Sequence, residues 1–229
     1  MVRKIHQSIA LCLVLPIFLT ACGKVQSNTD SDIRGADVNT KLSSEIQNAA
    51  NSVVVFPDRQ METSVRAAMV YPTGNITVEM LSGLKFLTLR NASIVSINGI
   101  ENCTSLTELN LADNKIVDIS ILANLTSLKT LFLASNKIVN ISPLQNLTGL
   151  TTLHLYNNRI ADISSLSNLV NLQWLELSEN KITNIAALSG LTQLTWLYMQ
   201  GNALNTSPNT LINNSVITKH KTRGCAVGY

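Results

Sequence analysis

Three residues of the types found in hydrolytic triads, His154, Glu176 and Ser178, lie in the second half of the sequence. In such a triad a histidine takes the proton of a serine nucleophile while a carboxylate orients the histidine. The chemistry also requires oxyanion donors and a pocket that excludes water. The sequence has no G-x-S-x-G nucleophile elbow and no glycine-rich phosphate loop. We therefore expect no catalytic site, and we interpret His154 and Glu176 as a pair that tunes recognition.

Metal and cofactor sites are not expected either. The chain has three histidines and four cysteines. One histidine and one cysteine, His6 and Cys12, lie in the N-terminal segment that we interpret below as an export signal. The spacing of the others matches no metal-binding motif. We therefore predict that the protein holds no metal ion and no cofactor.

The elements that position these residues follow from a repeat. A unit of 22 residues recurs six times without insertion, starting at Leu84, Leu106, Leu128, Leu150, Leu172 and Leu194. Leu predominates at places 1, 4, 6, 17 and 20 of the unit, Asn at place 9, and Ile at places 11 and 14. The segment L-x-x-L-x-L has the periodicity of a strand, so places 4 and 6 face the interior and places 3, 5 and 7 face outward.

The Asn at place 9 is expected to bond to backbone groups that the bend after the strand leaves unpaired. Ala92 interrupts this series in the first repeat, and the series then runs through Asn114, Asn136, Asn158, Asn180 and Asn202. The whole pattern is typical of leucine-rich repeats. It predicts an α/β leucine-rich-repeat solenoid, with a short curved parallel sheet on its concave face and short helical or 3-10 segments on its convex face. Because each repeat buries its apolar face against its neighbours, both ends of the stack need caps.

The Ile-rich turns "NKIVDIS" and "NRIADISSL", and the phrase "IVSINGIE" at Ile94 to Glu101, resemble the internalin family of bacterial surface proteins. The resemblance covers about residues 53–206 and implies a small helical N-terminal cap. The residues agree with this expectation, because Asp58 is a favourable N-cap residue. A stripe at helical spacing follows it, formed by Met61, Val65, Ala68 and Met69. Thr77 is expected to begin a second short helix.

An export signal occupies the N-terminus. Arg3 and Lys4 precede an apolar run from Ile9 to Leu19, which is too short to span a bilayer. The run ends in "LTAC" at Leu19 to Cys22, which resembles the bacterial lipobox and implies cleavage before Cys22 and lipid attachment to it. The alternative is an ordinary secretory signal with an incidental cysteine.

The segments divide the chain as follows. We predict a lipoprotein signal peptide (1–21), a lipidated cysteine with a flexible tether (22–52), a helical N-terminal cap (53–83), six repeats (84–206) and a C-terminal tail or cap (207–229). Cys103 lies in the first repeat and Cys225 in the tail. Strands about 4.8 Å apart place the first and sixth repeats roughly 24 Å apart, whereas disulfide Cα atoms lie within about 7 Å. We therefore predict that Cys103 and Cys225 are not bonded to each other.

Aromatic residues gather at the outward strand places, although the chain is only 4% aromatic. Both tryptophans and most aromatics outside the signal lie at places 3, 5 or 7, and they crowd the last three repeats. Exposed Trp and Tyr clusters are typical of binding hot spots. The predicted ligand-binding residues are Phe132, His154, Tyr156, Trp174, Glu176, Trp196 and Tyr198. Two alternatives remain: the aromatics stabilise the sheet by cross-strand contact, or the C-terminal tail covers them.

The predicted function is binding of a protein partner, from the host or the envelope, by a non-enzymatic lipoprotein of the bacterial cell envelope. The resemblance to internalins implies a role in host adhesion or virulence. Gly23 after the lipobox cysteine resembles a signal for sorting to the outer membrane, if the organism has one. The protein would then be displayed on the cell surface or in the periplasm. Carbohydrate binding and an envelope scaffold are alternatives. Outside the predicted signal the chain has 15 Lys and Arg and 14 Asp and Glu, so its net charge is small. Since no basic stripe is expected along the repeats, nucleic acid is not an expected partner.

Overall fold

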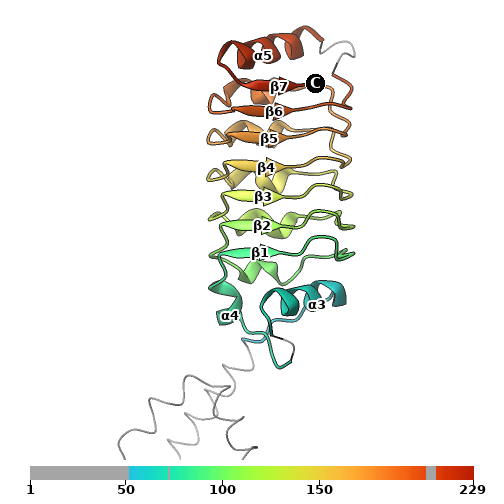
Figure 1. Ribbon diagram of the computed structural model, residues 1–229, viewed down its shortest axis with the longest axis vertical. Coiled ribbons are helices and arrows are strands. Elements are labelled where there is room, and N and C mark those ends of the chain that lie inside the picture. The colour runs from blue at the N-terminus through green and yellow to red at the C-terminus, as the bar shows by residue number, and fades with distance from the viewer. Residues whose placement is uncertain (1–51, 72, 205–209) are drawn as a thin grey trace, which may run out of the picture. The chain divides into compact units, whose positions relative to one another are not determined.

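A computed structural model describes residues 52–71, 73–204 and 210–229. The predicted signal peptide, Cys22 and all of the predicted tether except its last residue lie outside the described residues. In the part of the chain that the structure describes, no helix has both the length and the apolar character needed to cross a bilayer. The described residues form a stack of repeats with helices at each end (Figure 1).

Helix α3 (Arg59–Ala68) lies at the N-terminal end of the stack (Figure 1). Its N-cap is Asp58, as predicted, because Oδ1 of Asp58 accepts hydrogen bonds from two amides of the first turn at 2.7 and 3.2 Å. The other carboxylate oxygen accepts from the amides of Val95 and Ser96 at 2.7 and 3.0 Å. Burial raises the pKa of Asp58, but these four backbone bonds outweigh it and leave the pKa below its ordinary value. One side chain thus starts the helix and joins it to the first repeat.

The stripe predicted on α3 is confirmed only in part. Met61 and Val65 are buried in the core and Met69 is half-buried against it, but Ala68 is exposed. The helix ends at Ala68, and Met69 covers the core from the C-cap position instead. Helix α4 (Val78–Ser82) follows, and its start at Thr77 is confirmed by a bond from the Met80 amide to the Thr77 hydroxyl at 3.3 Å.

Seven short strands form one parallel sheet in chain order (Figure 1). They are β1 (Phe86–Thr88), β2 (Glu108–Asn110), β3 (Thr130–Phe132), β4 (Thr152–His154), β5 (Trp174–Glu176), β6 (Trp196–Tyr198) and β7 (Ala226–Gly228). From β1 to β6 each residue pairs with the residue at the same place of the next repeat, for example Leu87 with Leu109. The repeat therefore fixes the register, as the sequence predicts.

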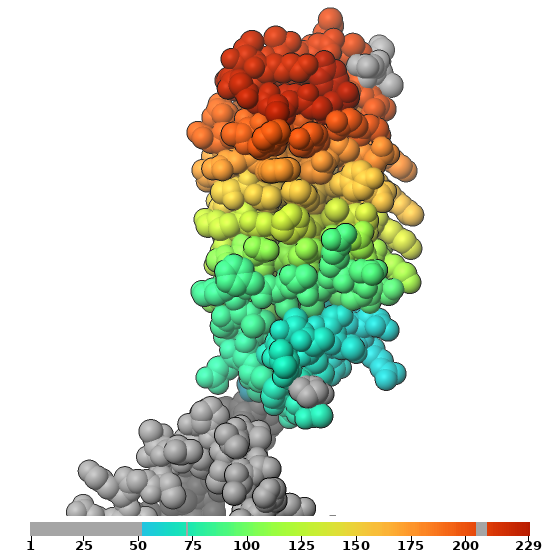
Figure 2. Space-filling view, viewed as in Figure 1, coloured from blue at the N-terminus to red at the C-terminus, as the bar shows by residue number. Residues whose placement is uncertain are grey.

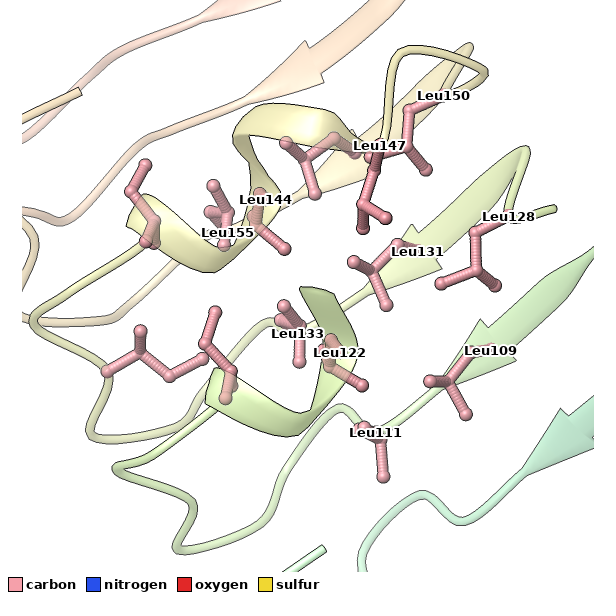
Figure 3. Packing of buried hydrophobic residues seen from close by; sticks show 14 of the residues in the cluster. Leu109, Leu111, Leu122, Leu128, Leu131, Leu133, Leu144, Leu147, Leu150 and Leu155 are labelled. Atoms are coloured by element: carbon pink, nitrogen blue, oxygen red, sulfur yellow. The ribbon is translucent and has the colours of Figure 1, made fainter. Parts of the chain in front are cut away.

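Five 3-10 helices form the side of the stack opposite the sheet. They are η1 (Ile100–Asn102), η2 (Ser120–Asn124), η3 (Ser142–Asn146), η4 (Ser164–Asn168) and η5 (Ala186–Gly190). The apolar residues of this region recur every three residues, at places 14, 17 and 20. A 3-10 helix has three residues per turn, so all three side chains face the core. Figure 3 shows Leu122 and Leu144 from η2 and η3 pointing toward strand leucines such as Leu131.

The core is a continuous column of Leu and Ile side chains, nearly all of them fully buried. Cys103 occupies place 20 of the first repeat and is buried where the other repeats have Leu. Burial, with the charge of Glu101, raises the pKa of the Cys103 thiol to about 12. Cys103 and Cys225 are both free, and they lie toward opposite ends of the stack.

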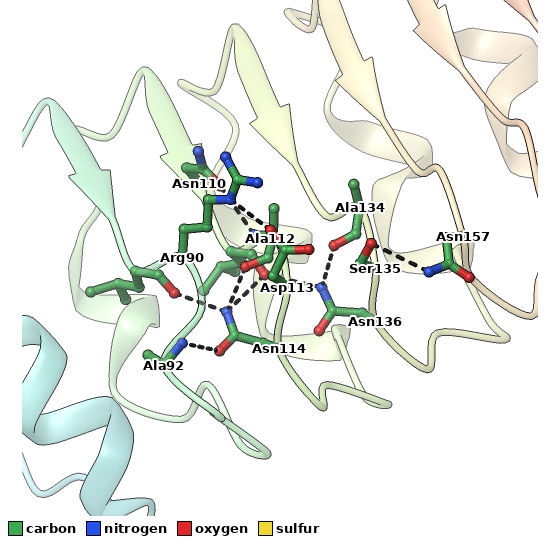
Figure 4. A network of polar contacts seen from close by, with 12 residues as sticks. Arg90, Ala92, Asn110, Ala112, Asp113, Asn114, Ala134, Ser135, Asn136 and Asn157 are labelled. Carbon is green, nitrogen blue, oxygen red and sulfur yellow. Dashed lines mark hydrogen bonds and ion pairs between the residues drawn. The ribbon is translucent and has the colours of Figure 1, made fainter.

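The asparagines of place 9 bond to the backbone of two successive repeats (Figure 4). Asn136 is representative: Oδ1 accepts from the Ile116 amide at 3.0 Å, and Nδ2 donates to the Leu111 carbonyl at 3.0 Å. Nδ2 also lies within 3.1 and 3.2 Å of the Leu133 and Ala134 carbonyls of its own repeat. The predicted role of this asparagine series is confirmed.

The C-terminal residues 210–229 form a cap and extend the sheet. Helix α5 (Thr210–Thr222) packs on η5 and β7 at the end of the stack (Figures 1 and 2). Oδ1 of Asn213 accepts from the Ile185 amide at 3.0 Å, and its Nδ2 donates to the Thr183 and Leu204 carbonyls at 2.7 Å each. In earlier repeats the carbonyl equivalent to that of Leu204 accepts from an amide of the next repeat, as Ile116 does from Lys137, so a helix side chain satisfies a group that a further repeat would pair.

Candidate binding surface

The outer surface of the sheet, called the sheet face below, is built by alternation along each strand. In every strand from β1 to β6 the middle Leu is buried and the residues on either side of it are exposed or half-buried. Side chains at places 3, 5 and 7 of different repeats therefore lie next to one another, although they are 22 residues apart in sequence.

Rings from four successive strands form a connected series on this face. The Phe132 and His154 rings meet edge to face with centroids 4.8 Å apart, and His154 stacks on Trp174 at 5.7 Å. Trp174 lies 5.6 Å from Trp196 and 6.5 Å from Tyr198. Trp196 and Tyr198 stack at 6.4 Å with an interplanar angle of 11°. Trp174 and Trp196 occupy the same place of adjacent repeats and are neighbours, as this spacing predicts, but their rings are tilted by 30° and do not stack in parallel.

We call this series, together with Tyr156, the aromatic patch: Phe132, His154, Tyr156, Trp174, Trp196 and Tyr198. Trp174 and Trp196 are 38% and 42% exposed, so their rings face solvent although they also pack on each other. Tyr156 is 42% exposed, and it makes no ring contact with the others among the described residues. Phe86, at the far end of the sheet face, is 70% exposed and separate from the patch.

His154 and Glu176 face each other across β4 and β5, as predicted. Burial lowers the pKa of His154 below its ordinary value, and the nearby Glu176 carboxylate only partly opposes this. The imidazole is therefore neutral at pH 7. Oε1 of Glu176 accepts a hydrogen bond from the Ser178 amide at 2.8 Å.

The three residues of triad type do not form a triad. The Ser178 side chain is buried, and its hydroxyl donates to Oε1 of Gln200 at 2.8 Å. The hydroxyl is thus directed away from His154 and toward the next repeat. The structure also contains no cluster of His, Cys, Asp or Glu that could hold a metal ion, counting only the described residues.

The described C-terminal residues 210–229 leave the tryptophans of the aromatic patch partly exposed, which contradicts the hypothesis that this part of the tail covers them. Strand β7 lies beside β6, where Ala226 and Gly228 pair with Trp196 and Tyr198. A Cβ at Gly228 would clash with Nε2 of Gln200 and would lie 3.0 Å from Cδ1 of Tyr198, so a larger residue here would require these two side chains to shift. Gly228 was not among the predicted site residues. Val227 and Leu197 are 30 residues apart, and the 22-residue period therefore could not reveal the seventh strand.

The structure corrects one expectation about charge, because a basic stripe does run along the repeats. Place 10 carries an exposed cation in four successive repeats, at Lys115, Lys137, Arg159 and Lys181. The constant period stacks any residue type that recurs at one place. Asp118 and Asp162 lie three places further along the same turns and offset part of this positive charge.

Comparisons with known proteins agree with this architecture. One family model, described as leucine rich repeat, matches residues 148–204, and another, described as leucine rich repeats in two copies, matches residues 82–124 and 126–168. The chain is a leucine-rich-repeat protein. No curated protein sequence is similar enough to count as a relative of this repeat protein.

Among solved structures, the repeat protein is similar to an internalin from Listeria monocytogenes, with 37% identity and a TM-score of 0.63 over 65% of this chain. It is also similar to the functional domain of InlJ from the same organism, with 31% identity and a TM-score of 0.54 over 64% of this chain. It spans 44% and 37% of those two chains. A leucine-rich-repeat protein from Leptospira interrogans is similar to this chain with 23% identity and a TM-score of 0.50. The match covers 66% of this chain and 44% of the Leptospira chain, and at this identity it shows the shared fold alone.

Proposed function

We propose that this repeat protein binds a protein partner through the aromatic patch and performs no chemistry on it. The observation that carries the proposal is the connected series of exposed rings on a sheet face that β7 extends but does not cover. Trp and Tyr are the residues that most often dominate binding free energy at protein interfaces. The structural similarity to internalins and the typically non-enzymatic character of such folds support the same function.

We propose further that the protein is displayed on the bacterial cell envelope by a lipid on Cys22. In a Gram-negative organism the anchor would lie in the outer membrane, with the repeats at the cell surface or in the periplasm. Display at the surface, combined with the similarity to internalins, favours a host protein as partner and a role in adhesion or virulence. The support for the lipid anchor is the sequence "LTAC" at the end of the apolar run.

Carbohydrate binding is the second candidate. The Trp196 and Tyr198 rings are nearly parallel, and flat aromatic platforms of this kind also stack on sugar rings. A glycan array and a pull-down from cell-surface extracts, performed with the same protein, separate the two. Saturable binding to glycans without a protein ligand would favour the second candidate.

Substitution of the tryptophans tests whether the patch is the binding site. We expect Trp174→Ala or Trp196→Ala to cost at least about 2 kcal/mol of affinity for the captured partner. Since both rings are partly exposed, the free energy of unfolding should change by no more than about 1 kcal/mol. Phe86→Ala removes an exposed ring from the same face and is the matched control, which should retain affinity. Unchanged affinity in both tryptophan variants would place the binding site elsewhere.

A further inference from the structure

Glu176 has an unusual position within the aromatic patch. It lies on β5 with His154 opposite it on β4 and Tyr198 opposite it on β6. Trp174, two residues earlier on the same strand, points to the same side of the sheet and contacts both the His154 and the Tyr198 rings. The carboxylate is therefore the one charged group among the rings, and it is half-buried there.

The charge of Glu176 is not balanced by this part of the protein. Among the described residues the ion pairs are Arg66 with Glu62 and Arg90 with Asp113, both at the N-terminal end. One carboxylate oxygen of Glu176 accepts the Ser178 amide, and no hydrogen bond to the other is present in the described part of the chain. Places 3, 5 and 7 of the last four repeats contain no Lys or Arg, and the neutral His154 contributes no positive charge at pH 7.

Aromatic rings beside an unpaired carboxylate favour the binding of a positively charged group. The face of an aromatic ring carries negative electrostatic potential, which attracts a cation placed over it, and Trp is the strongest of the side chains in this respect. A guanidinium group is planar, is weakly hydrated and donates paired hydrogen bonds to a carboxylate, so it can stack on a ring and bond to Glu176 at once.

We propose that Glu176, Trp174 and Tyr198 form a subsite that binds an arginine side chain of the protein partner. This inference rests on the proposed function and specifies the chemistry that the partner must present. The free carboxylate oxygen of Glu176 accepts the guanidinium hydrogen bonds, and the Trp174 and Tyr198 rings contact its flat face. The partner should therefore carry an exposed arginine at the centre of its interface.

The test uses the full-length protein in a non-ionic detergent and the peptide acetyl-Gly-Arg-Gly-amide as the probe. Its matched control is the same peptide with citrulline, which has the shape of arginine but no charge. Both tryptophans of the chain lie in the patch, so intrinsic fluorescence reports binding there directly. We expect a saturable change with the arginine peptide and at least about tenfold weaker binding of the citrulline peptide.

The substitution Glu176→Gln measures the contribution of the carboxylate to binding separately from that of the rings. Gln keeps an acceptor for the Ser178 amide, so the fold should be retained, and the arginine peptide should bind at least about tenfold more weakly. Glu108→Gln removes a carboxylate from β2 on the same face, away from the patch, and should change binding by less than about twofold. Equal binding of both peptides, or full binding by Glu176→Gln, would overturn the subsite.

The same measurements separate this inference from the proposed function. If Trp174→Ala weakens capture of the protein partner while the arginine peptide shows no dependence on Glu176, the subsite is refuted and the binding function stands. If the arginine peptide binds in a Glu176-dependent manner while the tryptophan variants capture the partner normally, the site binds a guanidinium group, but the proposed interface is refuted, and with it the assignment of this group to the protein partner.

Discussion

At the scale of single residues, the amide of asparagine explains why place 9 is so uniform. The amide both donates and accepts, so one side chain pairs an N–H and a carbonyl of the preceding repeat as well as carbonyls of its own. This also explains why Ala92 is tolerated. The first repeat has no preceding repeat to pair with, and its own bend is served by Asn114, whose Oδ1 accepts from the Ala92 and Ile94 amides.

Replacing Asn136 with Ala should lower stability without changing the binding surface. The Ile116 amide and the Leu111 carbonyl would lose a partner inside the stack, which costs about 1 to 3 kcal/mol. Asn146→Ala, at an exposed position at the end of η3, is the control and should have little effect. Denaturant unfolding of both variants measures the difference. An unchanged midpoint and slope for Asn136→Ala would show that the backbone groups find other partners.

At the scale of elements, the sequence predicts what the repeat specifies and where the two N-terminal helices begin, but it does not predict the C-terminal helix or the seventh strand. The strands, their register and the apolar spacing behind the 3-10 helices all follow from the period. Helix α5 does not follow from the period, and its buried face cannot be recognised from its apolar residues. Leu211 and Ile212 are exposed, whereas Asn213 and His220 are buried and bond to the backbone of the last repeats. A search for an apolar stripe therefore cannot find the face that packs.

The role of α5 as a cap is tested by a pair of neighbouring asparagines. Asn213→Ala should destabilise the protein by about 1 to 3 kcal/mol, because it leaves the Ile185 amide and two carbonyls unpaired under the helix. Asn214→Ala changes the adjacent, exposed residue and should leave stability nearly unchanged. Thermal or denaturant unfolding compares the two variants. Equal stability of both would mean that α5 does not satisfy the end of the stack through Asn213.

The candidate site is a property of several repeats at once. The constant period predicts that Trp174 and Trp196 are neighbours, and that His154 faces Glu176, because equivalent places pair across parallel strands. The period does not predict ring orientation, the bond between Ser178 and Gln200, or the position of the C-terminal segment. Those depend on side-chain packing and on β7, which has no counterpart in the repeat. Whether the rings are open to a partner is therefore known only from the fold.

At the scale of the whole molecule, membrane attachment is predicted to depend on one cysteine outside the described residues. Cys22→Ser should remove the acceptor of the lipid, so the protein should move from the membrane fraction to the soluble fraction and lose incorporation of a labelled fatty acid. Two acyl chains or an equivalent second signal are needed for stable anchoring, so loss of the lipidated residue should abolish it.

Cys12→Ser is the matched control for this experiment, because Cys12 lies inside the apolar run that is predicted to be removed with the signal. This variant should remain labelled and membrane-bound. Fractionation and labelling are measured on both variants in the same cells. If Cys22→Ser stays in the membrane fraction with unchanged label, the sequence "LTAC" does not direct lipidation. The alternative, an ordinary secretory signal, predicts a different result. Both variants should then be soluble and unlabelled, because cleavage of such a signal leaves no lipid on the protein.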